Sequence, residues 1–193
     1  VIIATGASAK YLGLDDEKKY NGQGVSACAT CDGFFYRKKD VAVVGGGDTA
    51  CEEATYLSNI CKKVYMIVRR DVFRASKAMQ EKVLNTPNIE VLWNCNTQEV
   101  LGDVNGVTGA RLVRKDGKVF DISIDGFFLG IGHHPNADLF KEWIHTDENG
   151  YIITEGKSSR TGVDGVFAAG DVQDPHYRQA ITAAASGCRA ALD

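Results

Sequence analysis

The chain has 193 residues, of which 44% are hydrophobic and 24% are charged, and its formal net charge is -3. This balance is ordinary for a globular protein with a sizeable core, and it lacks the basic surface that nucleic acid binding requires. No apolar run reaches the roughly 18 residues of a membrane span, and the first residues lack the positive charge of a signal peptide. We therefore expect no nucleic-acid or membrane partner. A chain of this size and hydrophobic content does not need its six cysteines as a disulfide framework, so we expect a cytoplasmic protein with mostly reduced thiols.

The first half of the chain predicts strands that alternate with helices. Residues 1–6 indicate a buried strand that runs into a glycine turn. The expected elements that follow are a strand over 41–44, a helix over 48–60, a strand over 64–68, a helix over 75–84 and a strand over 89–93. This alternation is typical of a doubly wound α/β fold with a parallel, Rossmann-like sheet.

The second half predicts a hairpin and a closing helix. Strands over 107–113 and 118–124 are separated by Asp116-Gly117, which is a hairpin turn signal. The remaining expected elements are strands over 127–131 and 166–169 and an alanine-rich helix over 179–192, with a polar, turn-rich segment over 138–164 between the two strands. The chain opens inside a strand and stops inside a helix, so we expect it to be a piece of a longer protein.

A Gly-x-Gly-x-x-Ala turn lies between the strand over 41–44 and the helix that follows. Gly45 permits the tight turn, Gly47 lets the backbone approach a phosphate, and Ala50 keeps helix and strand close. Asp48 and Thr49 open the helix, whose N-terminus attracts anions. The motif is weak alone, but its position between a strand and a helix favours a dinucleotide pyrophosphate.

An arginine cluster follows the next strand, at Arg69, Arg70 and Arg74. An NAD site usually places an acid there for the ribose 2′-hydroxyl, whereas arginines suit the 2′-phosphate of NADP. A solvated basic turn is the alternative reading. The position of the cluster favours NADPH.

Two cysteines with two residues between them, Cys28 and Cys31, precede the Gly-x-Gly-x-x-Ala turn. Such a pair can close into a disulfide and reopen by thiol–disulfide exchange, although two small buried residues near a turn would have the same pattern. The polar flanks favour the redox role, and Asp32 adds a carboxyl that can relay protons. We expect the other four cysteines, which are Cys51, Cys61, Cys95 and Cys188, to pack as small hydrophobic residues. We expect no metal site, because no other Cys or His pair has zinc-ligand spacing.

A flavin normally converts the hydride of NADPH into thiolate chemistry, so the chain should also hold FAD. The segment 165–171 offers Gly170 and Asp171 at a strand end, where a carboxylate can bind a ribityl hydroxyl. A Gly-Asp pair in this place is also a common turn.

Taken together, these motifs resemble the bacterial-type, low-molecular-weight thioredoxin reductases over nearly the whole chain. The resemblance rests on five segments, which are 4–7, 25–33, 45–50 with 52–54, 69–71 with 73–75, and 165–172 with 177–180. It implies that NADPH reduces FAD, that FAD reduces the Cys28–Cys31 disulfide, and that the dithiol reduces thioredoxin, with one cysteine facing the flavin and the other attacking the partner. It adds Thr5, Gly6, Arg178, Gln179 and Ala180 to the FAD-binding residues.

The resemblance also implies the domain organisation. Residues 1–12 and 137–193 correspond to remnants of an FAD domain, and residues 13–136 to the NADPH domain with the cysteine pair. Hinges are expected near residues 12–13 and 136–138, and the complete enzyme is expected to be a homodimer. The family's first FAD half is missing here, so we expect this chain alone to bind flavin poorly and to turn over slightly or not at all.

Two other functions stay open on the sequence alone. One is the flavoprotein component of an alkyl hydroperoxide reductase system, which shares this core. The other is a non-catalytic NADPH-binding redox module, which the missing FAD half would suit.

Overall fold

The computed structural model describes all residues from 1 to 193, and the chain divides into two compact units. The central unit consists of residues 10–132, and the terminal unit consists of residues 1–9 and 133–193. The chain passes between the units after residues 9 and 132, whereas the sequence places these points after residues 12 and 136. The assignment of each unit to a cofactor, and the hinges, stay predictions.

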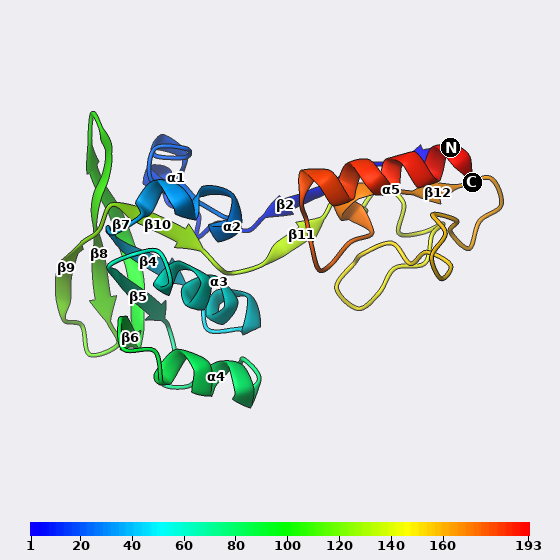
Figure 1. Ribbon diagram of the computed structural model, residues 1–193. Helices are drawn as coiled ribbons and strands as arrows, with labels where there is room; N and C mark the ends of the chain where they lie inside the picture. The colour runs from blue at the N-terminus through cyan, green and yellow to red at the C-terminus, as the bar shows by residue number, and fades with distance from the viewer. The chain divides into compact units, whose positions relative to one another are not determined.

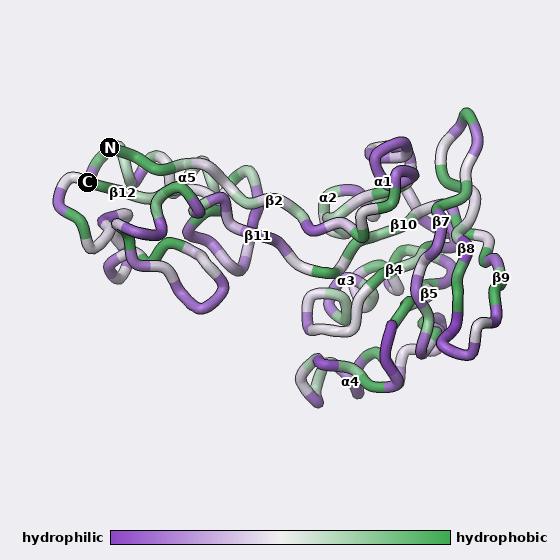
Figure 2. Tube along the Cα trace, turned by 180° about the vertical axis from the view of Figure 1, so that it is seen from behind, coloured by the Kyte–Doolittle hydropathy of each residue, from purple (hydrophilic) through white to green (hydrophobic).

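The central unit is built on a parallel sheet of five strands in the order β3-β10-β4-β5-β6 (Figure 1). Its strands are β3 (Val25–Ser26), β4 (Asp40–Val44), β5 (Lys63–Val68), β6 (Ile89–Trp93) and β10 (Gly126–Leu129). The strand β10 is buried throughout and is green, hydrophobic, in Figure 2. This sheet confirms the predicted α/β class and the strands expected in this part of the chain.

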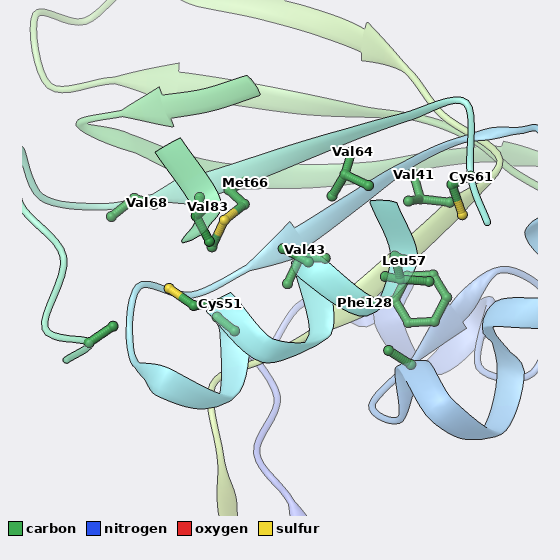
Figure 3. Packing of buried hydrophobic residues seen from close by; sticks show 14 of the residues in the cluster. Val41, Val43, Cys51, Leu57, Cys61, Val64, Met66, Val68, Val83 and Phe128 are labelled. Atoms are coloured by element: carbon green, nitrogen blue, oxygen red, sulfur yellow. The ribbon is translucent and has the colours of Figure 1, made fainter. Parts of the chain in front are cut away.

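Helices α3 (Asp48–Ser58) and α4 (Lys77–Leu84) cover one face of the sheet. The reason is the helical spacing of Ala50, Ala54 and Leu57, which are fully buried. Leu57 lies against Phe128 of the sheet in Figure 3, in a cluster that includes Val41, Val43 and Met66. Both helices lie within the ranges that the sequence predicts.

An antiparallel sheet packs on the opposite face. Its strands are β7 (Cys95–Asp103), β8 (Gly106–Arg114) and β9 (Val119–Ser123). It meets the alternate residues of β4, Ala42 and Val44, in a second buried cluster. The β8–β9 hairpin is confirmed, with Gly117 at a φ of 87° in its turn. The strand β7 was not predicted from the sequence.

Three short helical segments complete the central unit. They are α1 (Asp15–Lys19), α2 (Ala29–Asp32) and the 3-10 helix η1 (Gly33–Tyr36). None of them was predicted, because four or five residues are too few to show a helical period.

The terminal unit pairs distant parts of the chain. β1 (Ile2–Ile3) pairs in parallel with β12 (Phe167–Ala168), and β2 (Ala7–Ala9) pairs antiparallel with β11 (His133–Pro135). The 3-10 helix η2 (Gly170–Val172) and the long helix α5 (Ala180–Leu192) follow. Its buried cluster consists of Ile3, Ala137, Ile144, Ile152, Ala168 and Val172. No helix of the structure is long and apolar enough to cross a membrane.

Candidate functional site

Cys28 and Cys31 form a disulfide at the start of α2. Cys28 is the N-cap residue of this helix, and its Sγ accepts a hydrogen bond from the Cys31 N–H at 3.3 Å. Thr30 Oγ1 lies 3.4 Å from the same sulfur. Cys28 is partly buried and Cys31 is exposed. The pair is therefore held by the helix turn and stays accessible to a second molecule, as redox exchange requires.

Ser26 and Asp32 support the disulfide from the end of β3. The buried Ser26 hydroxyl donates a hydrogen bond to Asp32 Oδ2 at 2.7 Å and accepts one from the Cys28 N–H at 3.1 Å. The carboxyl that the sequence singles out is thus oriented by a serine that also orients the backbone of Cys28. The sequence shows Ser26 only as a polar neighbour of the pair, and its role comes from the structure.

Two aromatic side chains stand in solvent directly after the disulfide helix. Phe34 is 68% exposed and Phe35 is 73% exposed, both on η1. Neighbouring aromatic side chains that are both exposed are typical of a surface that binds a partner. The sequence reasoning missed them, because an adjacent aromatic pair usually belongs to a core.

The glycine turn is closely packed on one side and open on the other. Gly45 has a φ of 136°, and a Cβ there would lie 2.5 Å from the carbonyl oxygen of Gly130 and 2.8 Å from Ala50 Cβ. Gly47 is the N-cap of α3, and a Cβ there would meet nothing within 4 Å. The backbone is therefore open to close approach at Gly47, where α3 begins, and a helix N-terminus suits a phosphate.

The first residue of α3, Asp48, is tied to the loop before α4. Its Oδ1 accepts hydrogen bonds from the N–H and the hydroxyl of Ser76, at 2.9 Å and 2.8 Å. The bond from the Ser76 N–H, and then that from the hydroxyl, hold the pKa of Asp48 below its ordinary value. Thr49 lies in the first turn of α3 and is partly buried.

A pocket of about 360 Å³ joins the glycine turn to the arginine cluster. Its lining includes Gly45 and Gly46 after β4 and Arg69, Arg70 and Arg74 after β5. The three arginines are exposed, and none of them forms an ion pair. Free guanidinium groups beside a helix N-terminus make this pocket attractive to a ligand with several phosphates.

The lining of this pocket also includes residues that were not expected there. Tyr11 and Leu12, which precede α1, contribute an apolar wall. Thr97 of β7 contributes a hydroxyl that is buried and lacks a hydrogen-bond partner. A buried polar atom of this kind usually bonds to a ligand or water. No motif marks these positions, since they come from segments without a recognised element.

The residues expected to hold FAD all belong to the terminal unit. Thr5 Oγ1 donates to the Asn136 carbonyl at 2.6 Å, and Gly6 has a φ of 72°. The Gly170 N–H donates to Ser186 Oγ at 2.7 Å. Asp171 Oδ1 is buried and has no hydrogen-bond partner. An unpartnered buried carboxylate oxygen after β12 fits a group that brings hydroxyl donors, such as a ribityl chain.

The segment before α5 is held in an unusual conformation. Arg178 has a φ of 48° and donates to the Pro175 carbonyl, and Gln179 and Ala180 form the N-cap and first residue of α5. Asp174 accepts hydrogen bonds from the N–H groups of three following residues, His176 among them. Burial works against the charge of Asp174, but these donors outweigh it and lower its pKa.

The remaining cysteines divide into two kinds. Cys51, Cys61 and Cys95 are buried, as expected, and Cys188 is exposed on α5. The prediction that all four pack as hydrophobic residues is therefore wrong for Cys188. Cys188 lies on α5, where alanine occurs on several sides of the helix. The spacing of apolar residues therefore does not show which side of this helix is buried.

A Rossmann-like nucleotide-binding unit that carries an accessible disulfide defines a class of redox proteins. The family model for pyridine nucleotide-disulphide oxidoreductases matches residues 1–187, and the chain belongs to this family. It is 55% identical over 201 residues to a thioredoxin reductase of Coxiella burnetii, covering 100% of this chain and 63% of that protein. It is 54% identical over 200 residues to a protein of Pseudomonas fluorescens named glucosaminate ammonia-lyase, covering 100% of this chain and 62% of the relative.

Solved structures agree with these matches. The thioredoxin reductase from Giardia duodenalis superimposes with a TM-score of 0.93 at 49% identity, over 100% of this chain and 63% of that one. The thioredoxin reductase from Streptococcus pyogenes gives a TM-score of 0.94 at 40% identity, with the same coverage. The similarity confirms the Rossmann-like fold. The chain spans less than two thirds of the length of these relatives.

Proposed function

We propose that the protein containing this chain is a thioredoxin-disulfide reductase that transfers electrons from NADPH through FAD to the Cys28–Cys31 disulfide and on to thioredoxin. The observation that carries the proposal is the accessible disulfide, held by Ser26 and α2 in the same unit as the arginine-lined pocket. The relatives named thioredoxin reductase point to thioredoxin as the partner. The homodimer and the cytoplasmic location are part of this proposal and rest on the sequence alone.

The pocket of the central unit binds NADPH in this proposal. The open N-terminus of α3 at Gly47 receives the pyrophosphate, with Asp48, Thr49 and Ala50 forming the turn around it. Arg69, Arg70 and Arg74 receive the 2′-phosphate, which NADH lacks.

The terminal unit contributes to an FAD site. Asp171 accepts ribityl hydroxyl hydrogen bonds, while Thr5, Gly6, Gly170, Arg178, Gln179 and Ala180 form its surroundings. Bound FAD supplies the conversion of a two-electron hydride into electrons that a disulfide accepts.

The cysteines and Asp32 carry out the exchange with the partner. In the reduced state, the thiolate of one cysteine attacks the partner's disulfide and forms a mixed disulfide, and the partner's other sulfur leaves as a thiolate. The second cysteine then attacks its neighbour, which restores the Cys28–Cys31 bond and releases the reduced partner. Asp32 gives and takes the protons that these steps exchange, while Ser26 keeps its carboxyl in place. Phe34 and Phe35 give the partner an apolar docking surface beside the sulfurs.

One relative carries the name of an ammonia-lyase, and the disulfide favours the reductase over that activity. Elimination of ammonia transfers no electrons to a protein acceptor, so that reaction would not use a redox-active disulfide. A non-catalytic NADPH module would not need Cys28, Cys31 and Asp32 together, so the reductase is also favoured over that alternative.

Full-length protein with Cys31→Ser tests the proposal. NADPH should still bleach the flavin absorbance, while reduction of thioredoxin disulfide should stop. Cys188→Ser serves as the matched control, since Cys188 is an exposed cysteine remote in sequence from the pair, and its activity should be unchanged. Thioredoxin reduction that survives Cys31→Ser refutes the assigned role of the pair. Reduction of a peroxiredoxin-type partner in place of thioredoxin would support the alkyl hydroperoxide reductase alternative.

A further inference from the structure

The carboxylate of Glu17 is buried and is held only by backbone N–H groups. Glu17 is 1% exposed, on the short helix α1. Its Oε1 accepts a hydrogen bond from the Leu12 N–H at 3.0 Å, and its Oε2 accepts from the N–H groups of Gly13 and Leu14, at 2.9 Å and 3.1 Å. It forms no ion pair with a basic side chain. A buried charge with three donors on one short loop fixes that loop tightly.

The loop that Glu17 fixes begins with part of the nucleotide pocket. Leu12 donates one of the three hydrogen bonds and also lines the pocket, together with its neighbour Tyr11. Both side chains are more than one third exposed, so they lie at the surface of the pocket and not in the core. The other hydrogen bond at residues 11–14 is the one that begins α1, from the Glu17 N–H to the Leu14 carbonyl at 3.2 Å. The position of this wall therefore depends on the Glu17 carboxylate.

The wall lies at a defined end of the pocket. The Lys10 N–H donates to the Gly132 carbonyl at 3.0 Å, which ties this segment to the residues that follow β10. Ile131, from the same stretch, is also in the lining. The strand β4, with its glycine turn, stands between β10 and β5 in the sheet, and the arginines follow β5. The pocket therefore has a cationic end after β5, a phosphate-binding middle after β4 and an apolar end after β10.

A dinucleotide bound across this sheet puts its two halves at the two ends. The adenosine half with its 2′-phosphate belongs at the arginine end, so the nicotinamide half belongs at the end formed by Tyr11, Leu12 and Ile131. We propose that Glu17 is a positioning residue for the nicotinamide half of the nucleotide, because it fixes the backbone that presents Tyr11 and Leu12. This inference rests on the proposed NADPH site.

Binding measurements with two ligands on the full-length protein that contains this chain test the inference. NADP⁺ reaches both ends of the pocket, whereas adenosine 2′,5′-bisphosphate has no nicotinamide half and reaches only the arginine end. Glu17→Ala should weaken NADP⁺ binding about tenfold, an effect of the size expected for one lost apolar contact. The same variant should change the affinity for the bisphosphate by less than about twofold, since the arginine contacts persist.

Three further variants control the comparison. Asp15→Asn removes one acidic charge from the same helix without touching the loop, and it should change neither affinity. Glu17→Gln keeps a carbonyl acceptor for the loop, and it should restore part of the NADP⁺ affinity. Leu12→Ala trims the wall itself at a partly exposed site, so it should reproduce the selective loss even if Glu17→Ala folds poorly.

The outcomes separate this inference from the proposed function. Equal weakening of both ligands by Glu17→Ala and by Leu12→Ala, or no weakening of either, overturns the positioning role while leaving the nucleotide site intact. A wild-type full-length protein that binds neither ligand overturns the NADPH site, and the role of Glu17 with it. In the full-length enzyme, the positioning role predicts a higher KM for NADPH with Glu17→Ala, with a smaller effect on the KM for thioredoxin.

Discussion

Thiol labelling measures the state of the cysteine pair directly, because the other cysteines differ sharply in reactivity. Burial first, and then the charges of Asp48 and Glu52, raise the pKa of Cys51 to about 11. Burial, and then the charge of Asp40, raises the pKa of Cys61 to about 11 as well. The thiolate is the reactive species, so these two thiols should be nearly inert at neutral pH.

The size of the effect follows from these values. At pH 7 a thiol with a pKa near 11 is about 0.01% thiolate, whereas an ordinary thiol with a pKa near 8.5 is about 3% thiolate. Labelling of Cys51 and Cys61 should therefore be about 300-fold slower than that of an exposed thiol, before their burial is counted. Cys95 is 1% exposed, which slows it by access alone.

Native chain treated with N-ethylmaleimide at pH 7 should thus take up one label, at Cys188. Prior reduction with dithiothreitol, followed by its removal, should raise the count to three by adding Cys28 and Cys31. Mass spectrometry of the intact chain gives the count, and peptide mapping gives the positions. Three labels on the untreated chain, with two at Cys28 and Cys31, would refute the disulfide as the resting state.

Three further outcomes test the site. Gly45→Ala should cost on the order of 2–3 kcal/mol of unfolding free energy in urea titrations, because its Cβ would lie 2.5 Å from a backbone carbonyl oxygen at a φ of 136°. Replacing Phe34 and Phe35 with Ser should raise the KM for thioredoxin about tenfold or more in the full-length enzyme and leave the thermal midpoint unchanged, since both rings are exposed. Ser76→Ala should raise the pKa of Asp48 in an NMR titration, because both serine donors favour its ionised form, although the variant keeps the backbone donor. The stability that the Ser76 bonds give is present above the ordinary carboxyl pKa and is lost as the pH falls through the lowered value.

The sequence predicts the parallel sheet well because its strands are continuous apolar runs. β4 and β10 are buried along almost their whole length and β5 over most of it, so they appear as the apolar runs 41–44, 64–68 and 127–129. The glycine turn is also predictable from the sequence. The close approach of Gly45 to Ala50 and to the Gly130 carbonyl allows only small residues at positions 45 and 50.

The sequence does not predict β7, and its geometry explains why. Its pairing with β8 shifts register between Thr97 and Glu99 and again between Leu101 and Gly102. Each irregularity breaks the alternation of buried and exposed residues that marks a half-buried strand. The pocket residues that β7 supplies, Thr97 among them, were therefore missed as well.

The burial of Glu17 is also hidden in the sequence. It stands in the run Asp15-Asp16-Glu17-Lys18-Lys19, which is typical of an exposed helix surface. A run of charged residues does not show by itself which of them is buried. Only the fold shows that Glu17 points inward, to the N–H groups of the preceding loop.

The lining of the nucleotide pocket bears on how electrons reach the sulfurs. Neither Cys28 nor Cys31 is among its residues, and α2 instead packs beside α3, where a Cβ on Gly33 would meet Leu57 at 2.9 Å. We therefore expect a nicotinamide bound in that pocket not to reach the disulfide directly, as the proposed electron path through FAD requires. We expect NADPH added to the flavin-free chain to leave the label count at one, whereas dithiothreitol raises it to three. A count of three with NADPH alone would mean direct transfer, and it would remove the need for FAD from the proposed mechanism.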